Sequence, residues 1–89
     1  MPEITLTVHH SAGLHARPAA LFVQTAAQFE SDITARHGQR EANAKSILGV
    51  LTLGASQGAV IIIRAQGLDA DQAVSALRVL VESNFGEAG

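Results

Sequence analysis

Residues 13–20 constrain the fold most, because they join a strand pattern directly to a helix pattern. Upstream, residues 3–8 alternate apolar and polar side chains, which is typical of a half-buried strand. Gly13 then gives the loop conformational freedom, and Pro18 fixes φ where a helix can begin without leaving an N–H group unpaired. Because the residue before a proline disfavours the α region, Arg17 is a candidate for the helix cap. The stretch predicts a strand, a loop and a helix in immediate succession.

The same stretch places an imidazole and a guanidinium beside the predicted helix start, at His15 and Arg17. The first N–H groups of a helix lack intrahelical partners and the helix dipole makes that end positive, so an anion is stabilised there. A neutral imidazole is a nucleophile that can hold such an anion covalently, and guanidinium donors suit phosphate oxygens. An isolated histidine here would more often be a polar loop residue. With Gly13, Arg17 and Pro18 around it, we predict that His15 accepts a phosphoryl group.

Composition limits the other possibilities. The chain has 89 residues, enough for one small domain, and is 47% apolar but only 3% aromatic, so aliphatic side chains must fill the core. A net charge of −2 without a basic run argues against a nucleic-acid partner. No apolar run reaches spanning length, and the candidate at residues 59–63 is strand-sized, so no membrane insertion is expected.

Localisation and metal binding are constrained by the same composition. The start Met-Pro-Glu-Ile lacks the basic residues and apolar run of a signal peptide, which favours a cytoplasmic protein. Cysteine is absent, which excludes a disulfide framework, a thiol nucleophile and a thiolate metal site. His9 and His10 are adjacent and point to opposite sides of an extended chain, so we interpret them as surface residues. No metal and no cofactor are expected.

The pattern along the chain predicts seven elements in the order β-α-β-β-α-β-α, with strands at residues 3–8, 33–37, 40–43 and 59–65, and helices at 18–29, at 47–53 and after Asp69. The run 60–63 is apolar at successive positions, which suggests a central place in the sheet. Asp69 is expected to cap the last helix with Gln72 in the capping-box position, residues 84–89 to fray, and His37 to be solvated. Short strands, a tight hairpin and helices with single apolar faces favour an α+β fold, an antiparallel sheet covered by helices on one side.

The short helix after residue 46 carries a surplus of apolar residues. Ser46 is a natural N-cap for it, and Gly54 supplies its stop. If Val50 and Leu53 face the core, three side chains are left partly outside: Ile47, Leu48 and Leu51. An exposed apolar patch on a small protein usually marks a partner surface. The alternative is that an adjoining loop covers the patch.

Two motifs resemble those of the HPr family, the histidine-containing phosphocarriers of the phosphoenolpyruvate-dependent sugar phosphotransferase system. The run GLHARPAA at residues 13–20 is similar to the active-site signature of the family, and KSILGVLTLG at residues 45–54 resembles the signature around its regulatory serine. The resemblance covers essentially the whole chain, residues 1–89, as a single HPr-like domain. It implies an open-faced sandwich, with a four-stranded antiparallel sheet that carries three helices on one face.

The resemblance also implies a mechanism and a set of partners. His15 would take a phosphoryl group on Nδ1 from phosphorylated enzyme I and pass it to the IIA domain of a sugar permease. Arg17 and the backbone N–H groups of Ala16 and Arg17 would steady the phosphate. Such a protein is a monomeric carrier, consumed and regenerated in each cycle, and not an enzyme. In some relatives a dedicated kinase phosphorylates the serine that corresponds to Ser46, so a serine kinase/phosphorylase is a further expected partner.

Weak, fast association with two partners suits a small apolar surface near His15. The residues expected in this docking surface are Ala20, Gln24, Ile47, Leu48 and Leu51. Many relatives ring the surface with lysines, whereas this chain has Gln24, Ala27 and Gly49 at those positions. Without these lysines, the extent to which electrostatic steering brings acidic partners to the chain is left open.

Two alternative functions would use the same residues differently. A regulatory binding module would dock on a transcription factor after phosphorylation of Ser46, without sugar transport. The presence of His15 argues against that as the sole role. An enzyme with a histidine nucleophile would need a second base, and the nearest carboxylates in the pattern, Glu3, Glu30 and Asp32, do not accompany His15.

Overall fold

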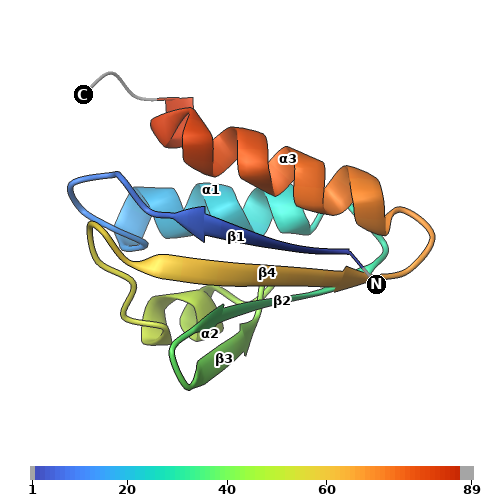
Figure 1. Ribbon diagram of the computed structural model, residues 1–89, viewed down its shortest axis with the longest axis horizontal. Coiled ribbons are helices and arrows are strands. Elements are labelled where there is room, and N and C mark those ends of the chain that lie inside the picture. Colours follow the sequence, from blue (N-terminus) through green and yellow to red (C-terminus); the bar gives the residue numbers. More distant parts are fainter. Residues whose placement is uncertain (1, 87–89) are drawn as a thin grey trace.

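The computed structural model describes residues 2–86, and within that range it contains the seven predicted elements in the predicted order, followed by a short 3-10 helix (Figure 1). The strands are β1 (Glu3–Thr7), β2 (Asp32–His37), β3 (Arg40–Asn43) and β4 (Val60–Gln66). The helices are α1 (Ala16–Ala26), α2 (Ile47–Thr52), α3 (Ala70–Glu82) and the 3-10 helix η1 (Asn84–Gly86). Residues 87–89, the end of the segment predicted to fray, lie outside the described residues.

The strands form one antiparallel sheet in the order β1-β4-β2-β3. Leu6 on β1 lies opposite Ile61 on β4, and Ala35 on β2 lies opposite Ile63. Strand β4 therefore has a partner on each side, which confirms the central place predicted from its apolar run. In Figure 1, α3 runs alongside β1 and β4, and it packs against both strands.

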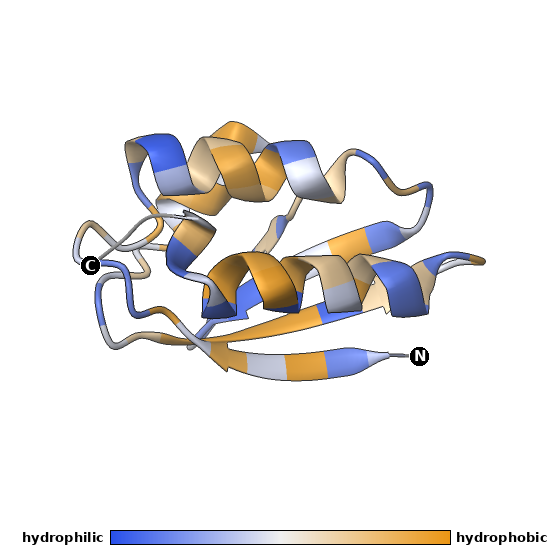
Figure 2. Ribbon diagram, turned by 90° about the horizontal axis from the view of Figure 1, so that it is seen from above, coloured by the Kyte–Doolittle hydropathy of each residue, from blue (hydrophilic) through white to orange (hydrophobic). Residues whose placement is uncertain are grey.

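One face of the sheet is buried and the other is open. Leu6, Ile33 and Ile61 are at most 5% exposed, whereas Val60, the neighbour of Ile61 on β4, is 51% exposed. Figure 2 shows the matching alternation of hydrophobic and hydrophilic residues along β1. A strand points successive side chains to opposite faces, so this alternation makes one face apolar. The architecture is the predicted α+β open-faced sandwich.

The core between sheet and helices is largely aliphatic, as the composition required. Its largest fully buried side chains are Phe22, Ile33, Leu53, Ile61, Ile63, Leu77, Val8, Val50 and Val81. Burying a side chain of this kind contributes about 1.5–3 kcal/mol relative to leaving it exposed. The helices contribute to this core from the faces that the sequence pattern predicted.

The boundaries of α1 differ from the predicted 18–29, because the helix begins at Ala16 and ends at Ala26. Beyond its end, the N–H groups of Gln28 and Phe29 donate to carbonyls three residues back, at 3.2 Å each, so the chain tightens into a turn. Phe29 is half-buried against the core. Its predicted contact with the core is therefore present, although the residue lies beyond the end of the helix.

The predicted capping box of α3 is wrong. Asp69 is the N-cap residue, but its carboxylate accepts hydrogen bonds from the loop before β2 and not from the first turn of α3. Its donors are the backbone N–H groups of Glu30 and Ser31, both at 2.9 Å, and the hydroxyl of Ser31. The hydroxyl of Ser31 first, and then these N–H groups, lower the pKa of Asp69 below its usual 3.8. Asp69 thus joins α3 to the segment that precedes β2.

The predicted fraying at the C-terminal end is wrong for residues 84–86. Phe85 lies in η1 and is only 4% exposed. Asn84 and Phe85 both have a φ of 58°, a left-handed backbone that turns the chain back so that the ring packs into the core cluster. Across residues 2–86, no helix is long and apolar enough to cross a membrane.

Candidate functional site

The loop that carries His15 is fixed against the segment between α2 and β4. Leu14 donates its N–H to the carbonyl of Ala55 at 2.7 Å, and Leu14 is 3% exposed. Gly13 has a φ of 66°, and a Cβ added there would stand 2.4 Å from the Ala55 carbonyl oxygen. Only glycine allows this close approach of two backbones. The two loops lie at the same end of the sheet (Figure 1).

His15 is the N-cap residue of α1, and its backbone is extended, with φ −132° and ψ 150°. The helix starts at Ala16, so the prediction that Arg17 caps the helix is wrong. The reason is local geometry: Ala16, the first residue of α1, has a φ of 47°, so the chain turns sharply directly after His15 and ahead of Arg17 and Pro18. A left-handed alanine costs about 1–2 kcal/mol, which the surrounding contacts must offset.

The side chains of this segment are open to solvent while the helix behind them is buried. His15, Ala16 and Arg17 are exposed, whereas Pro18 and Ala19 are buried. In the part of the chain that the structure describes, the His15 imidazole does not cap the helix with a hydrogen bond, and the first turn of α1 holds no acidic residue. The positive end of the helix dipole is therefore not neutralised within that turn.

A small hollow of about 190 Å³ lies beside His15 and is lined by Ala12, Leu14, His15, Leu51, Gly54, Ala55 and Ser56. It brings the imidazole-bearing loop together with Leu51 of α2. Sequence reasoning did not select Ala55 or Ser56, because they are far from His15 along the chain and carry no chemical signature of their own. The close approach of Gly13 to Ala55 explains why they meet.

Helix α2 carries apolar side chains that are exposed to solvent. Val50 and Leu53 are buried, as predicted, while Ile47 is 41% exposed, Leu48 is 72% exposed and Leu51 is half-buried. No loop among residues 2–86 covers Leu48 to the extent of burying it. The exposed apolar patch predicted for this helix is therefore present, and Leu51 connects it to the hollow beside His15.

Ser46 is the N-cap of α2, as predicted, and its hydroxyl oxygen accepts the N–H of Gly49 at 3.1 Å. The other end of α2 is held by the hairpin between β2 and β3. Nδ1 of His37 lies 2.8 Å from the carbonyl oxygen of Leu53, and Arg40 donates to the carbonyl of Thr52 at 3.0 Å. The prediction that His37 is merely solvated is wrong, because its ring bonds the Leu53 carbonyl, which the helix leaves unpaired.

The remaining residues predicted for docking lie on α1. Ala20 is half-buried and Gln24 is exposed, about one and two helical turns beyond Arg17. Helix α1 packs against α2, so both helices contribute to the same part of the molecule. Glu3, one of the carboxylates that the sequence pattern separates from His15, lies on β1 and forms an ion pair with Arg64 of β4 at 2.7 Å.

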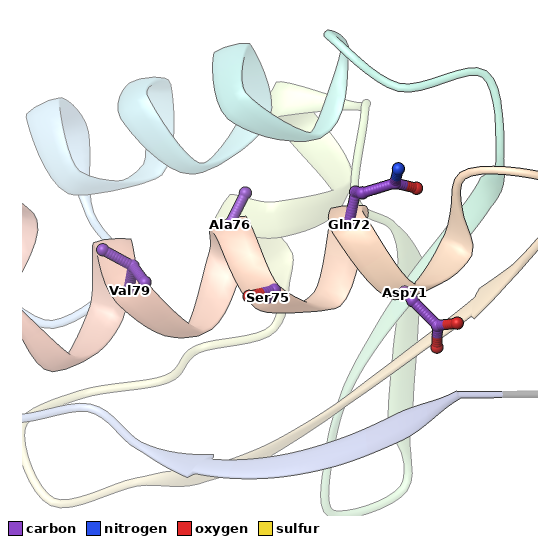
Figure 3. A pocket seen from close by; sticks show the side chains of 5 residues that line it. All are labelled: Asp71, Gln72, Ser75, Ala76 and Val79. Atoms are coloured by element: carbon purple, nitrogen blue, oxygen red, sulfur yellow. The ribbon is translucent and has the colours of Figure 1, made fainter.

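A larger hollow of about 630 Å³ lies on α3, lined by Asp71, Gln72, Ser75, Ala76 and Val79 (Figure 3). All five side chains come from this one helix, and none of them belongs to the predicted site. Across residues 2–86, no group of three or more His, Asp or Glu side chains could hold a metal ion. The residues of the predicted site lie instead around His15 and on α2.

Comparison with known proteins agrees with this geometry. The family model of the HPr component phosphorylation site of the phosphotransferase system (PTS) matches residues 2–83. The phosphocarrier protein HPr of Xylella fastidiosa (strain Temecula1) is 49% identical over 98% of both chains. The structure of HPr-C-His from Thermoanaerobacter tengcongensis is 49% identical, with a TM-score of 0.98 over the whole of both chains. An HPr dimer from the same organism is 50% identical, with a TM-score of 0.79 over 98% of this chain and all of the other. The chain therefore belongs to the HPr family, whose curated relatives are phosphocarrier proteins and not enzymes.

Proposed function

We propose that this chain accepts a phosphoryl group on His15 from phosphorylated enzyme I and passes it to the IIA domains of sugar permeases. The observation that carries the proposal is an exposed imidazole at the N-cap of α1, with no acidic residue in the first turn of that helix. In the transfer, the Nδ1 lone pair attacks phosphorus while the bond to the donor breaks and its electrons remain with enzyme I. The positive helix end favours the anionic phosphoryl group that the ring holds after transfer.

Arg17 and the backbone N–H groups of Ala16 and Arg17 hold the phosphate in this proposal. Arg17 is exposed and two residues from His15, and in residues 2–86 it takes part in no ion pair. Its guanidinium is thus available for bidentate hydrogen bonds to phosphate oxygens. The N–H groups at the start of α1 lack partners within the helix.

The docking surface for both partners consists of Ala20, Gln24, Ile47, Leu48 and Leu51. The exposure of Ile47 and Leu48 supports this assignment, because exposed apolar side chains lose water on association. Gln24, Ala27 and Gly49 replace the lysines of many relatives, so docking here depends on apolar contact more than on charge. Brief encounters with two partners need only a small interface of this kind.

Ser46 supports a second, regulatory function through a serine kinase/phosphorylase. Its hydroxyl lies at the start of α2, directly before the exposed Ile47 and Leu48. A phosphate there would place negative charge beside the docking surface. The alternative function, a regulatory binding module that acts through phosphorylated Ser46 without sugar transport, uses the same position.

We further propose that residues 1–89 act as one HPr-like domain, that the protein is cytoplasmic, and that it works as a monomer. A solved relative from Thermoanaerobacter tengcongensis is an HPr dimer, so the oligomeric state of this chain needs its own measurement. Size-exclusion chromatography with light scattering, at micromolar and millimolar chain concentration, decides between the two states.

Incubation with phosphoenolpyruvate and enzyme I tests the proposed function. The mass of the chain should rise by one phosphoryl group, and acid treatment should remove that group because phosphohistidine is acid-labile. His15→Ala should abolish the labelling and leave the fold intact, since the His15 side chain is exposed. Undiminished acid-labile labelling of His15→Ala would contradict the assignment and direct attention to His9, His10 and His37.

A further inference from the structure

Two consecutive N–H groups of the loop before His15 are both held by His10. The N–H of Ala12 donates to Nδ1 of the His10 ring at 3.0 Å, and the N–H of Gly13 donates to the His10 carbonyl at 2.9 Å. Because Nδ1 accepts a hydrogen bond here, it carries a lone pair and the proton of the neutral ring is on Nε2. The backbone of Ala12 and Gly13 is therefore fixed by a single upstream residue.

The His10 ring is in turn held by the C-terminal turn. It packs edge-to-face on the ring of Phe85, with centroids 5.8 Å apart and an interplanar angle of 80°. Phe85 is 4% exposed and reaches this place through left-handed backbone at Asn84 and Phe85. A buried aromatic partner in this geometry restrains the orientation of the imidazole, and hence the direction of its Nδ1 lone pair.

The segment that follows connects this loop to His15 through further backbone contacts. Gly13 lies against the backbone of Ala55, and the N–H of Leu14 donates to the Ala55 carbonyl at 2.7 Å. His15 comes next, with extended backbone, and then Ala16 with its φ of 47°. Backbone hydrogen bonds at Ala12, Gly13 and Leu14 therefore lie between His10 and His15.

We propose that His10 is a positioning residue for phosphoryl transfer at His15, an inference that rests on the proposed function of the chain. Its Nδ1 and carbonyl set the loop, and Phe85 sets its ring, so that His15 and the N–H groups at the start of α1 face the same phosphate. The C-terminal turn is thereby part of the machinery that holds the reactive loop. The contribution of His10 is to geometry at the moment of transfer and not to docking.

A pair of substitutions separates the hydrogen bond of His10 from its ring packing. His10→Asn removes the ring but keeps an acceptor, because an asparagine side chain readily bonds the N–H two residues on. His10→Phe keeps an aromatic ring against Phe85 but has no acceptor for the Ala12 N–H. The neighbouring His9 is exposed, so His9→Phe and His9→Asn are matched controls.

The variants are compared as acceptors from phosphorylated enzyme I, with melting temperature and amide hydrogen exchange measured alongside. His10→Phe should lower kcat by about tenfold with little change in KM, and should speed exchange at Ala12, since one positioning hydrogen bond is lost. His10→Asn should transfer at close to the wild-type rate even if its melting temperature falls. Both His9 variants should behave as wild type.

Three results would overturn the inference. A wild-type kcat for His10→Phe would show that the Nδ1 bond is irrelevant, and an equal loss in His10→Asn would show that only ring packing matters. If the wild-type chain is phosphorylated and either of these results is found, His10 has no positioning role, but the proposed phosphocarrier function is unaffected. A wild-type chain that takes no acid-labile phosphate at all overturns the proposed function and the positioning role together.

Discussion

His15 lies between two residues with left-handed backbone, Gly13 with a φ of 66° and Ala16 with a φ of 47°. Glycine adopts this conformation freely, whereas alanine does so at a cost of about 1–2 kcal/mol. Strain of this kind persists only where the surrounding contacts determine the backbone, here the bonds of Leu14 to Ala55 and of the loop to His10. The backbone around the proposed phosphoacceptor is therefore held in part by two residues outside the proposed phosphate site, His10 and Ala55.

Gly13→Ala should lower the free energy of unfolding by about 3 kcal/mol or more, measured by urea denaturation. The new Cβ would meet two backbone atoms, 2.4 Å away at Ala55 and 2.7 Å away at Ser56, and backbone atoms cannot move aside cheaply. Gly38→Ala is the matched control, because Gly38 has a φ of 61° but open space around its Cβ position. It should cost only about 1 kcal/mol. Equal losses at both sites would show that the close approach at Gly13 does not limit stability.

The chemistry at this scale could be predicted because it is local. The order of His15, Arg17 and Pro18 already places an imidazole and a guanidinium at a helix start. The backbone of Ala16 could not be predicted, since alanine gives no sign of a positive φ. Ser56 and the contact of the His10 ring with Phe85 were also missed, because each depends on contacts that form only when the loop closes on distant segments.

Helix α2 is short, and it is held at both ends by side-chain bonds. Ser46 caps its start, while His37 and Arg40 bond the carbonyls at its finish. A helix of this length is marginal by itself, so these bonds and the burial of Val50 must stabilise it. The consequence is an apolar patch presented to solvent on a fixed support.

Leu48→Asp should weaken binding to enzyme I by roughly tenfold while costing less than about 1 kcal/mol of stability. Leu48 is 72% exposed, so its replacement leaves the core intact but puts a charge into the docking surface. Titration calorimetry and urea denaturation measure the two effects. Val50→Ala is the contrasting variant, because Val50 is fully buried and its truncation should cost about 2 kcal/mol. A large loss of stability in Leu48→Asp would mean that this side chain belongs to the core.

The carboxylate of Asp69 should make stability depend on pH in the acid range. Its pKa is lowered in the folded chain, so its stabilising effect is fully present above its ordinary pKa of 3.8 and is lost as pH falls through the lowered value. The advantage of wild type over Asp69→Asn should thus shrink below about pH 4. Ser31→Ala removes the leading cause and should raise the pKa of Asp69, which a carbon-detected NMR titration measures. An unchanged pKa in Ser31→Ala would contradict the assignment of that cause.

Elements were predicted well where a local pattern determines them and less well where tertiary contacts compete. Strand β3 has the predicted bounds because it directly follows the turn at Gly38 that the sequence marks. Asp69 has the residue type and position of a capping-box residue, but the N–H groups of Glu30 and Ser31 take its carboxylate. Those donors belong to another segment, so no inspection of α3 by itself could identify them.

The two-layer architecture of the molecule follows from the apolar faces that its strands and helices must bury. Strands with one apolar face and helices with one apolar stripe can satisfy each other only as a two-layer structure. The order of elements and the central place of β4 followed from that pattern. The pairing of β1 with β4 at the register of Leu6 and Ile61 did not, because many registers preserve the same alternation.

The two motifs of the chain meet at one end of this two-layer structure. The loop with His15 and the helix after Ser46 share the hollow lined by His15 and Leu51, although the motifs are well separated in the sequence. A partner that reaches His15 must therefore lie close to α2. A change of charge at Ser46 should then alter transfer at His15 without any change in the fold.

Ser46→Asp should slow phosphoryl transfer from enzyme I to His15 while leaving the melting temperature unchanged or slightly higher. Aspartate is as good an N-cap as serine, so it can still accept the N–H of Gly49, and its charge suits the positive helix end. The same charge lies beside Ile47, which loses water against the partner in the proposed docking, and an uncompensated anion is costly to bury.

Ser46→Asn and Ser46→Ala separate the charge from the cap in this comparison. Asparagine caps without charge, so Ser46→Asn should match wild type in both rate and stability. Ser46→Ala has neither cap nor charge, so it should lose about 1 kcal/mol of stability and still transfer at the wild-type rate. Stopped transfer reactions, quantified by phosphoprotein gels, measure the rates. If Ser46→Asp transfers as fast as Ser46→Asn, the charge has no effect on docking and Ser46 serves only to cap α2.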